Sequence, residues 1–259
     1  MKTLKNFKAP YRTVSGAYVD LAHPERETRE TIRIQDIASH LSKINRFNGA
    51  TEKTYTVGQH CLFMTQFFIN AVTPDTPQRK ALIDLMRGTQ FYHWILELSV
   101  GEGSRDERRA AAYDLLMHDA TEAYLGDMTS PLKALMPEYK ALEARWDARI
   151  RSLYNQAENS HPIVKRLDVI ALEVERTLFK SPDPDDMDTA HLWPVLSHEE
   201  QALAEWLVES QEVQALARLP RDVIANRFID LHFALGCNDL AVYKEGEKGD
   251  HYSKNNPYS

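Results

Sequence analysis

Hydrophobic residues recur at helical spacing along most of the chain. After Asp36, apolar residues follow at Ile37, Leu41 and Ile44, which is the interval of one helix face, and Asp36 is itself a residue type that favours the N-cap position. The pattern is typical of an all-α protein. It predicts helices over 36–47, 57–71, 78–98, 106–125, 138–157, 162–179, 198–217 and 221–235, the last ended by Gly236.

The N-terminal region has a different pattern. Ser15-Gly16 and His23-Pro24 mark turns between short extended pieces within residues 8–35, so we expect an irregular arm with one small hairpin. No internal repeat or low-complexity linker divides the rest. We predict a single domain over 1–240 and a mobile tail over 241–259, where the sequence has almost nothing to bury.

Composition limits the location and the partners. At 259 residues, with 43% hydrophobic and 27% charged residues, the chain is typical of a globular protein. No apolar stretch approaches the roughly 20 residues of a membrane span and the start has no signal-peptide core, so we expect a cytoplasmic protein without a membrane partner. The net charge of -7 argues against duplex nucleic acid as a partner, whereas a small phosphorylated substrate needs only a few local cations. Cys61 and Cys237 lie in apolar helical patterns, which indicates buried reduced thiols.

Three titratable residues interrupt an apolar helical run. The segment DLLMHDATEAYLGD, residues 114–127, carries His118, Asp119 and Glu122. Burying such groups costs free energy unless they bind something that offsets their desolvation. On a helix His118 and Glu122 are four apart, and Asp119 and Glu122 three apart, so all three can border one cavity.

Two further polar residues lie in apolar stripes of other predicted helices. His60 and Asp168 each have apolar neighbours at helical spacing. Taken alone, His60 reads as a satisfied core histidine, and Asp168 as a surface residue paired with Arg166 or Lys165. Together with His118 and Asp119 they make two imidazoles and two carboxylates from three helices, a donor set suited to a divalent transition metal.

The chemistry of such a site is compatible with phosphate ester hydrolysis, which needs a nucleophilic water, charge neutralisation on phosphoryl oxygens and a proton for the leaving oxygen. Manganese, cobalt, nickel, iron and zinc all accept these ligands, and magnesium is less natural with two imidazoles. Glu122 can relay a proton. Arg46 offers a planar fork for two phosphate oxygens, although a solvated helix end is the alternative. Lys133 can add a point charge or can be a plain surface residue.

These residues lie in segments that resemble a known family, the HD-domain metal-dependent phosphohydrolases, in the nucleotide-cleaving branch with bacterial 5'-deoxynucleotidases and phage dATP triphosphohydrolases. The resemblance covers roughly residues 12–180. It rests on TVSGAYVDL, on IRIQDIASHLSKINRFNG leading into YTVGQH, on LLMHDATEAYLGDMTSPLK and on RLDVIALEVE. It implies an HD-domain helical bundle and a homo-oligomer.

The resemblance also implies roles for individual residues. The implied metal ligands are His60, His118, Asp119 and Asp168, and the implied catalytic acid or base is Glu122. The implied substrate contacts are Arg46 for phosphate, Phe47 as a wall against the sugar and Asp127 for the 3'-hydroxyl. Phe47 can equally be core, and Asp127 can equally cap the next turn.

The chain departs from the family pattern at two places. The sequence between His60 and His118 is longer than expected for relatives. The additional residues, near 74–107, can be a lid, an oligomer contact or an insertion without a function. Where some relatives have tryptophan after the phosphate arginine, this chain has Phe47, followed by Asn48 and Gly49. The smaller wall leaves the preference for sugar and base open.

Several functions are therefore in competition. The leading hypothesis is a deoxynucleoside triphosphate triphosphohydrolase that releases triphosphate, with dATP favoured. The alternatives are a 5'-deoxynucleotidase acting on deoxynucleoside monophosphates, a phosphodiesterase of cyclic or signalling nucleotides, and a non-catalytic nucleotide-binding regulator. Four candidate ligands together with Glu122 argue against the regulator, because mere binding does not need that acid.

Overall fold

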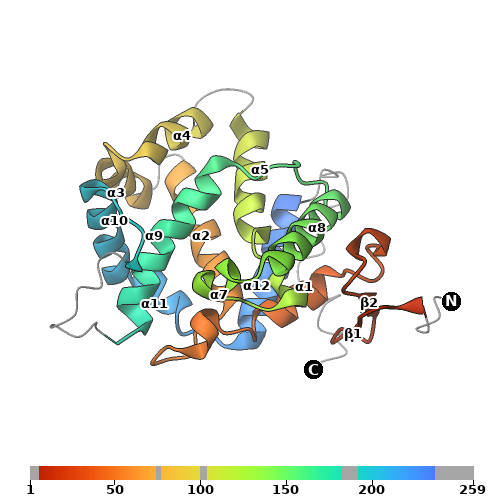
Figure 1. Ribbon diagram of the computed structural model, residues 1–259. Coiled ribbons are helices and arrows are strands. Elements are labelled where there is room, and N and C mark those ends of the chain that lie inside the picture. The colour runs from red at the N-terminus through yellow and green to blue at the C-terminus, as the bar shows by residue number, and fades with distance from the viewer. Residues whose placement is uncertain (1–5, 74–76, 100–103, 182–191, 237–259) are drawn as a thin grey trace.

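The computed structural model describes residues 6–73, 77–99, 104–181 and 192–236. Within these ranges the protein is all-α apart from one N-terminal hairpin, as the sequence predicts (Figure 1). In the hairpin, β1 (Pro10–Arg12) pairs antiparallel with β2 (Tyr18–Asp20). The helices are α1 (Ile34–Leu41), α2 (Val57–Val72), α3 (Pro77–Met86), α4 (Gln90–Ser99), α5 (Ser104–Met117), α6 (Glu122–Leu125), α7 (Ser130–Ala134), α8 (Pro137–Leu153), α9 (Pro162–Phe179), α10 (His198–Glu209), α11 (Gln211–Leu216) and α12 (Arg221–Gly236).

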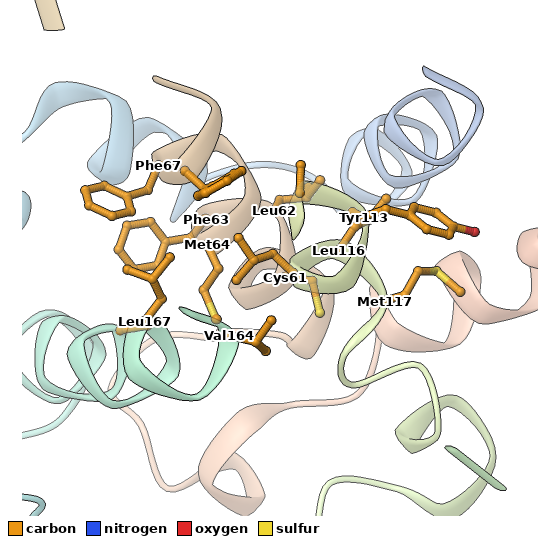
Figure 2. Close-up of a cluster of buried hydrophobic side chains, with 14 of the residues drawn as sticks. Cys61, Leu62, Phe63, Met64, Phe67, Tyr113, Leu116, Met117, Val164 and Leu167 are labelled. Atoms are coloured by element: carbon orange, nitrogen blue, oxygen red, sulfur yellow. The ribbon is translucent and has the colours of Figure 1, made fainter. Parts of the chain in front are cut away.

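Helix α2 is the centre of the core. It contacts α1, α3, α4, α5, α9, α11 and α12, and most of its residues are buried, which is expected for a helix that is apolar on nearly every side. Figure 2 shows its side chains between those of α5 and α9, with Cys61 among them as a buried free thiol. A capping box starts this helix, because the Thr56 hydroxyl accepts from Gln59 N and Gln59 Oε1 accepts from Thr56 N.

Several predicted helix boundaries are wrong. Asp36 lies inside α1 instead of capping it, because its buried carboxylate accepts hydrogen bonds from the backbone and hydroxyl of Ser15 and so ties the N-terminal arm to the helix. The predicted helix 78–98 is two helices separated at Gly88, whose φ of 91° suits glycine. The predicted helices 106–125 and 198–217 are likewise divided, at residues 118–121 and at Ser210.

The surplus segment near 74–107 contributes two helices to the core. Helix α3 contacts α2 and α10, and α4 contacts α2, α5 and α9. Leu82, Met86, Ile95 and Leu98 are buried there. Residues 74–76 and 100–103, Cys237 and the predicted tail 241–259 lie outside the described residues, and the single-domain assignment stays a prediction. Among the described residues, none of the helices combines the length and apolar character that a membrane crossing requires.

Gly58 permits the close packing of α2 against α1 and α12. A Cβ at this position would lie 2.8 Å from Ile224 Cγ2 and 3.2 Å from backbone atoms of Leu41 and Ser42. We expect Gly58→Ala to lower the free energy of unfolding by about 1–3 kcal/mol, because overpacking outweighs the better helix propensity of alanine. Urea denaturation measures this. Ser152→Ala, on the exposed face of α8, is the control, and equal stability of both variants would contradict the packing argument.

The buried His232 makes stability depend on pH. Its Nδ1 lies 2.9 Å from the Tyr113 hydroxyl, and burial, followed by the charge of Arg29, lowers its pKa from 6.5 to about 4. The unfolded chain therefore takes up this proton at a higher pH than the folded chain, so stability is present above about pH 6.5 and falls as the pH drops toward 4. Between pH 7 and pH 5 we expect His232 to account for a loss of about 2 kcal/mol.

The measurement is urea denaturation of the wild type and of His232→Asn at both pH values. Other histidines titrate in the same range, so the difference between the two proteins isolates the contribution of His232. An identical loss of stability in both proteins would show that His232 has no such role.

Candidate metal centre

His60 lies one turn into α2, in the position that the capping box at Thr56 sets. Its side chain is 0% exposed. Its Nδ1 lies 2.5 Å from Glu175 Oε1, and because a carboxylate only accepts, Nδ1 carries the proton. The Nε2 atom of His60 therefore carries the lone pair, and it faces His118 and Asp168.

His118 and Asp119 lie in a turn and not on a helix, which corrects the predicted helical spacing with Glu122. Helix α5 ends at Met117, and α6 begins at Glu122. His118 Nδ1 donates to Leu115 O at 2.8 Å, so its Nε2 is also the unprotonated nitrogen in the neutral ring. His118 Nε2 lies 3.1 Å from His60 Nε2.

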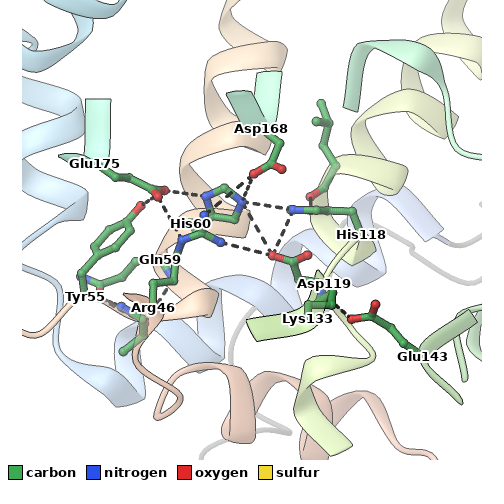
Figure 3. A network of polar contacts seen from close by, with 12 residues as sticks. Arg46, Tyr55, Gln59, His60, His118, Asp119, Lys133, Glu143, Asp168 and Glu175 are labelled. Atoms are coloured by element: carbon green, nitrogen blue, oxygen red, sulfur yellow. Dashed lines mark hydrogen bonds and ion pairs between the residues drawn. The ribbon is translucent and has the colours of Figure 1, made fainter. Parts of the chain in front are cut away.

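Two carboxylates complete the cluster that Figure 3 shows. Asp119 Oδ2 lies 3.2 Å from His118 Nε2 and 3.7 Å from His60 Nε2. Asp168 Oδ1, from α9, lies 3.3 Å from His60 Nε2. Ligands about 2.1 Å from one ion are separated by about 3.0–3.4 Å at octahedral or tetrahedral angles. Three of the four separations lie in this range, and the 3.7 Å between Asp119 Oδ2 and His60 Nε2 exceeds it.

The two imidazoles supply a further argument for a cation. With both Nδ1 protons committed, two nitrogen lone pairs face each other at 3.1 Å, which is repulsive unless a proton or a metal ion lies between them. Although burial alone lowers the pKa of His118, the negative charge of Asp119 raises it well above the usual value. The cluster therefore attracts positive charge. The ligand atoms of His60, His118 and Asp168 lie within 4.8 Å of one another, whereas Asp119 forms a second such group with His118 and Cys61.

The cluster is closed on one side and open on the other. The exposed fraction of the side chain rises from 0% at His60 to 9% at His118, 19% at Asp119 and 46% at Asp168. The cluster is therefore open to solvent on the side of Asp168. The alternative partner for Asp168, Arg166, instead pairs with Glu200.

Arg46 is part of the same network. An antiparallel bridge between Asn45 and Thr56 holds the backbone beside the start of α2. The guanidinium, 12% exposed, donates from Nε to Glu175 at 2.9 Å, and its terminal nitrogens lie 3.5 Å from Asp119 and 3.9 Å from Asp168. The interpretation of Arg46 as a solvated helix end is wrong, because its terminal nitrogens face the candidate ligands Asp119 and Asp168 instead of solvent.

Glu175 is a site residue that the sequence reasoning missed. It is 1% exposed and accepts from His60, Arg46 and the Tyr55 hydroxyl. A signal existed, because Glu175 follows Asp168 by seven residues in RLDVIALEVE and therefore lies on the same face of α9.

Phe47 follows Arg46 in an unusual backbone conformation. Phe47 and Asn48 have φ values of 56° and 52°, and Gly49 continues the left-handed turn at 75°. A bulky residue in this region is strained, and such strain concentrates at functional sites. The Phe47 ring lies 5.7 Å from the Arg46 guanidinium and 5.3 Å from Lys180 Nζ, so it is not a core residue but a wall between two cations.

Three other predicted site residues lie in the segment after Asp119. Glu122 is 6% exposed, and its Oε2 is a buried atom without a hydrogen-bond partner among the described residues. Burial, and then the charges of Asp119 and Asp127, raise the pKa of Glu122 well above the usual value. Asp127 does not cap the next helix, whose N-cap is Thr129. Lys133 donates to Glu143 at 2.7 Å, so its charge is already paired.

Two cavities lie away from the cluster, and the larger of them, of about 540 Å³, is lined by residues of α2, α11 and α12. A groove of about 380 Å³ between α2, α10 and α11 is lined mainly by apolar side chains such as Phe63, Phe67 and Trp206. Its lining contains none of the four candidate ligands. The candidate metal centre is therefore separate from this groove.

Comparisons with known proteins identify relatives that are described as uncharacterized. No protein-family model matches the chain. The chain is 31% identical to the uncharacterized protein YfdR of Escherichia coli (strain K12) over 185 residues, which are 71% of this chain and 77% of that protein. It is 29% identical over 196 residues to an uncharacterized protein of Rhodobacter capsulatus, covering 68% of this chain and 82% of that protein.

Proposed function

The chain belongs to the family of Escherichia coli YfdR, and we propose that it is a metal-dependent phosphohydrolase of 2'-deoxynucleotides. The proposed substrate is a deoxynucleoside triphosphate, with dATP first, and the proposed product is triphosphate. The observation that carries the proposal is the convergence of His60, His118, Asp119 and Asp168, with the terminal nitrogens of Arg46 directed at the two carboxylates.

The donor set supports a resident divalent ion of manganese, cobalt, iron, nickel or zinc. His60, His118, Asp119 and Asp168 would hold it. When bound, such an ion supplies charge neutralisation at phosphoryl oxygens and lowers the pKa of water toward about 7.

The other residues divide the remaining chemistry. Arg46 can bind two phosphoryl oxygens through the terminal nitrogens of its fork. In hydrolysis of a nucleotide at the ester bond, water adds to phosphorus and the sugar O5' leaves with a proton. Glu122, whose pKa is raised well above the usual value, is suited to hold that proton and donate it to O5'.

The nucleotide substrate is proposed from the resemblance to HD-domain phosphohydrolases together with the surroundings of the cluster. The strained Phe47 lies beside Arg46, where it can face the sugar. Asp127 is close enough to Glu122 to raise its pKa. From the resemblance, its proposed role is to accept a hydrogen bond from the 3'-hydroxyl. That the protein forms a homo-oligomer is proposed from the resemblance alone.

The test begins with metal-stripped protein. Manganese or cobalt is added back, and all deoxynucleoside triphosphates, deoxynucleoside monophosphates and their ribose forms are presented. Phosphate, pyrophosphate and triphosphate are identified separately. Triphosphate from one deoxynucleotide supports the proposal and identifies the base. Phosphate from monophosphates alone makes the protein a 5'-deoxynucleotidase, and no product from any nucleotide contradicts both activities.

A further inference from the structure

The carboxylate of Glu175 receives three hydrogen bonds in the interior of the protein. Oε1 accepts from His60 Nδ1 at 2.5 Å and from the Tyr55 hydroxyl at 3.0 Å, and Oε2 accepts from Arg46 Nε at 2.9 Å. Figure 3 shows the carboxylate between the His60 ring and the Arg46 side chain. A buried carboxylate costs free energy unless it is paired and hydrogen-bonded, and here both oxygens are.

We propose that Glu175 is a positioning residue that couples metal binding to phosphate binding, because one buried carboxylate holds both the ring of His60 and the guanidinium of Arg46. The inference rests on the proposed function, in which His60 binds the ion and Arg46 binds the phosphate. Glu175 itself touches neither.

Toward His60, Glu175 selects the tautomer. Since the carboxylate accepts from Nδ1, the Nε2 lone pair faces His118 Nε2 at 3.1 Å and Asp168 Oδ1 at 3.3 Å. A carboxylate behind a metal-binding histidine also orients the ring and makes it a stronger ligand. Loss of such an outer partner typically costs about 10- to 100-fold in metal affinity.

Toward Arg46, Glu175 sets the direction of the fork. With Nε engaged, the terminal nitrogens lie 3.5 Å from Asp119 Oδ2 and 3.9 Å from Asp168 Oδ1. Both carboxylates belong to the candidate ligand set. A cation bound by these carboxylates would weaken their attraction for the Arg46 guanidinium. The terminal N–H groups of Arg46 would then be available to bind phosphate. Because binding free energies are reciprocal, phosphate must then strengthen metal binding by the same factor.

The experiment uses full-length, metal-stripped protein and calorimetry. Cobalt is titrated first, and inorganic phosphate is titrated into both the stripped and the cobalt-loaded protein. The variants are Glu175→Gln and Tyr55→Phe, which removes one hydrogen bond but keeps the carboxylate. Glu173→Gln is the matched control, because Glu173 lies on the same helix and pairs with Arg176 away from the cluster.

We expect Glu175→Gln to bind cobalt about 10- to 100-fold more weakly and to lose much of the increase in phosphate affinity that cobalt produces. Tyr55→Phe should show a smaller loss in the same direction, and Glu173→Gln should match the wild type. Wild-type values for both affinities in a folded Glu175→Gln protein would overturn the inference.

A second measurement covers the case in which Glu175→Gln does not fold. In zinc-loaded wild-type protein, nitrogen NMR of the His60 ring should show the proton on Nδ1, and a proton on Nε2 would overturn the inference. The proposed function fails separately. A wild type that binds cobalt and phosphate as expected but cleaves no nucleotide contradicts only the activity, whereas a wild type that binds no cobalt contradicts both.

Discussion

Replacing His118 with alanine is expected to abolish metal-dependent turnover and to give the largest loss of any single substitution. The variant removes a proposed direct ligand, so cobalt affinity should fall by more than the roughly 100-fold upper range typical of outer partners. The large loss is expected from the geometry, because His118 Nε2 is the coordinating atom that lies 3.1–3.2 Å from both His60 Nε2 and Asp119 Oδ2. Calorimetric titration of cobalt and product release from dATP measure the two effects.

The control for this prediction is His198→Ala, which removes an exposed histidine from the first turn of α10. It should leave both measurements unchanged. Thermal unfolding of the stripped proteins must show that His118→Ala is folded. Wild-type cobalt affinity in a folded His118→Ala protein would exclude the cluster as the metal site.

The second large effect is expected for Glu122→Gln. A positioned general acid contributes typically about 100- to 10,000-fold, so kcat should fall by that factor while cobalt affinity and KM change little. Glutamine reproduces the shape of a protonated glutamic acid, which is the form that burial and the charges of Asp119 and Asp127 favour. Folding stability at neutral pH should therefore be preserved.

Steady-state kinetics with manganese or cobalt, paired with urea denaturation, test this prediction. Glu138→Gln, at an exposed position near the start of α8, is the matched control. If Glu122→Gln instead lost metal affinity together with kcat, Glu122 would be a ligand and not a proton donor. An unchanged kcat would show that Glu122 takes no part in the reaction.

The elements that depend on one strong local pattern were predictable. Helix α9 spans 162–179 as predicted, because an apolar stripe and a proline at its start specify it locally. The N-terminal hairpin was predicted from its turn residues. The boundary at Asp36 failed because a contact with Ser15, 21 residues away, decides it. The turn after Met117 was missed although the contact there is local, since His118 donates back to Leu115, three residues earlier.

The sequence by itself determined the all-α class and the residue types of the candidate site, since periodicity and isolated polar residues in apolar stripes are local properties of the chain. Only the tertiary structure decided how those residues meet. The contacts of Glu175 with His60 and Arg46 join positions more than a hundred residues apart, and they accompany the burial of Arg46 beside the strained turn at Phe47. Such contacts follow from how α2, α9 and the segment before α2 pack together, and no local pattern specifies that packing.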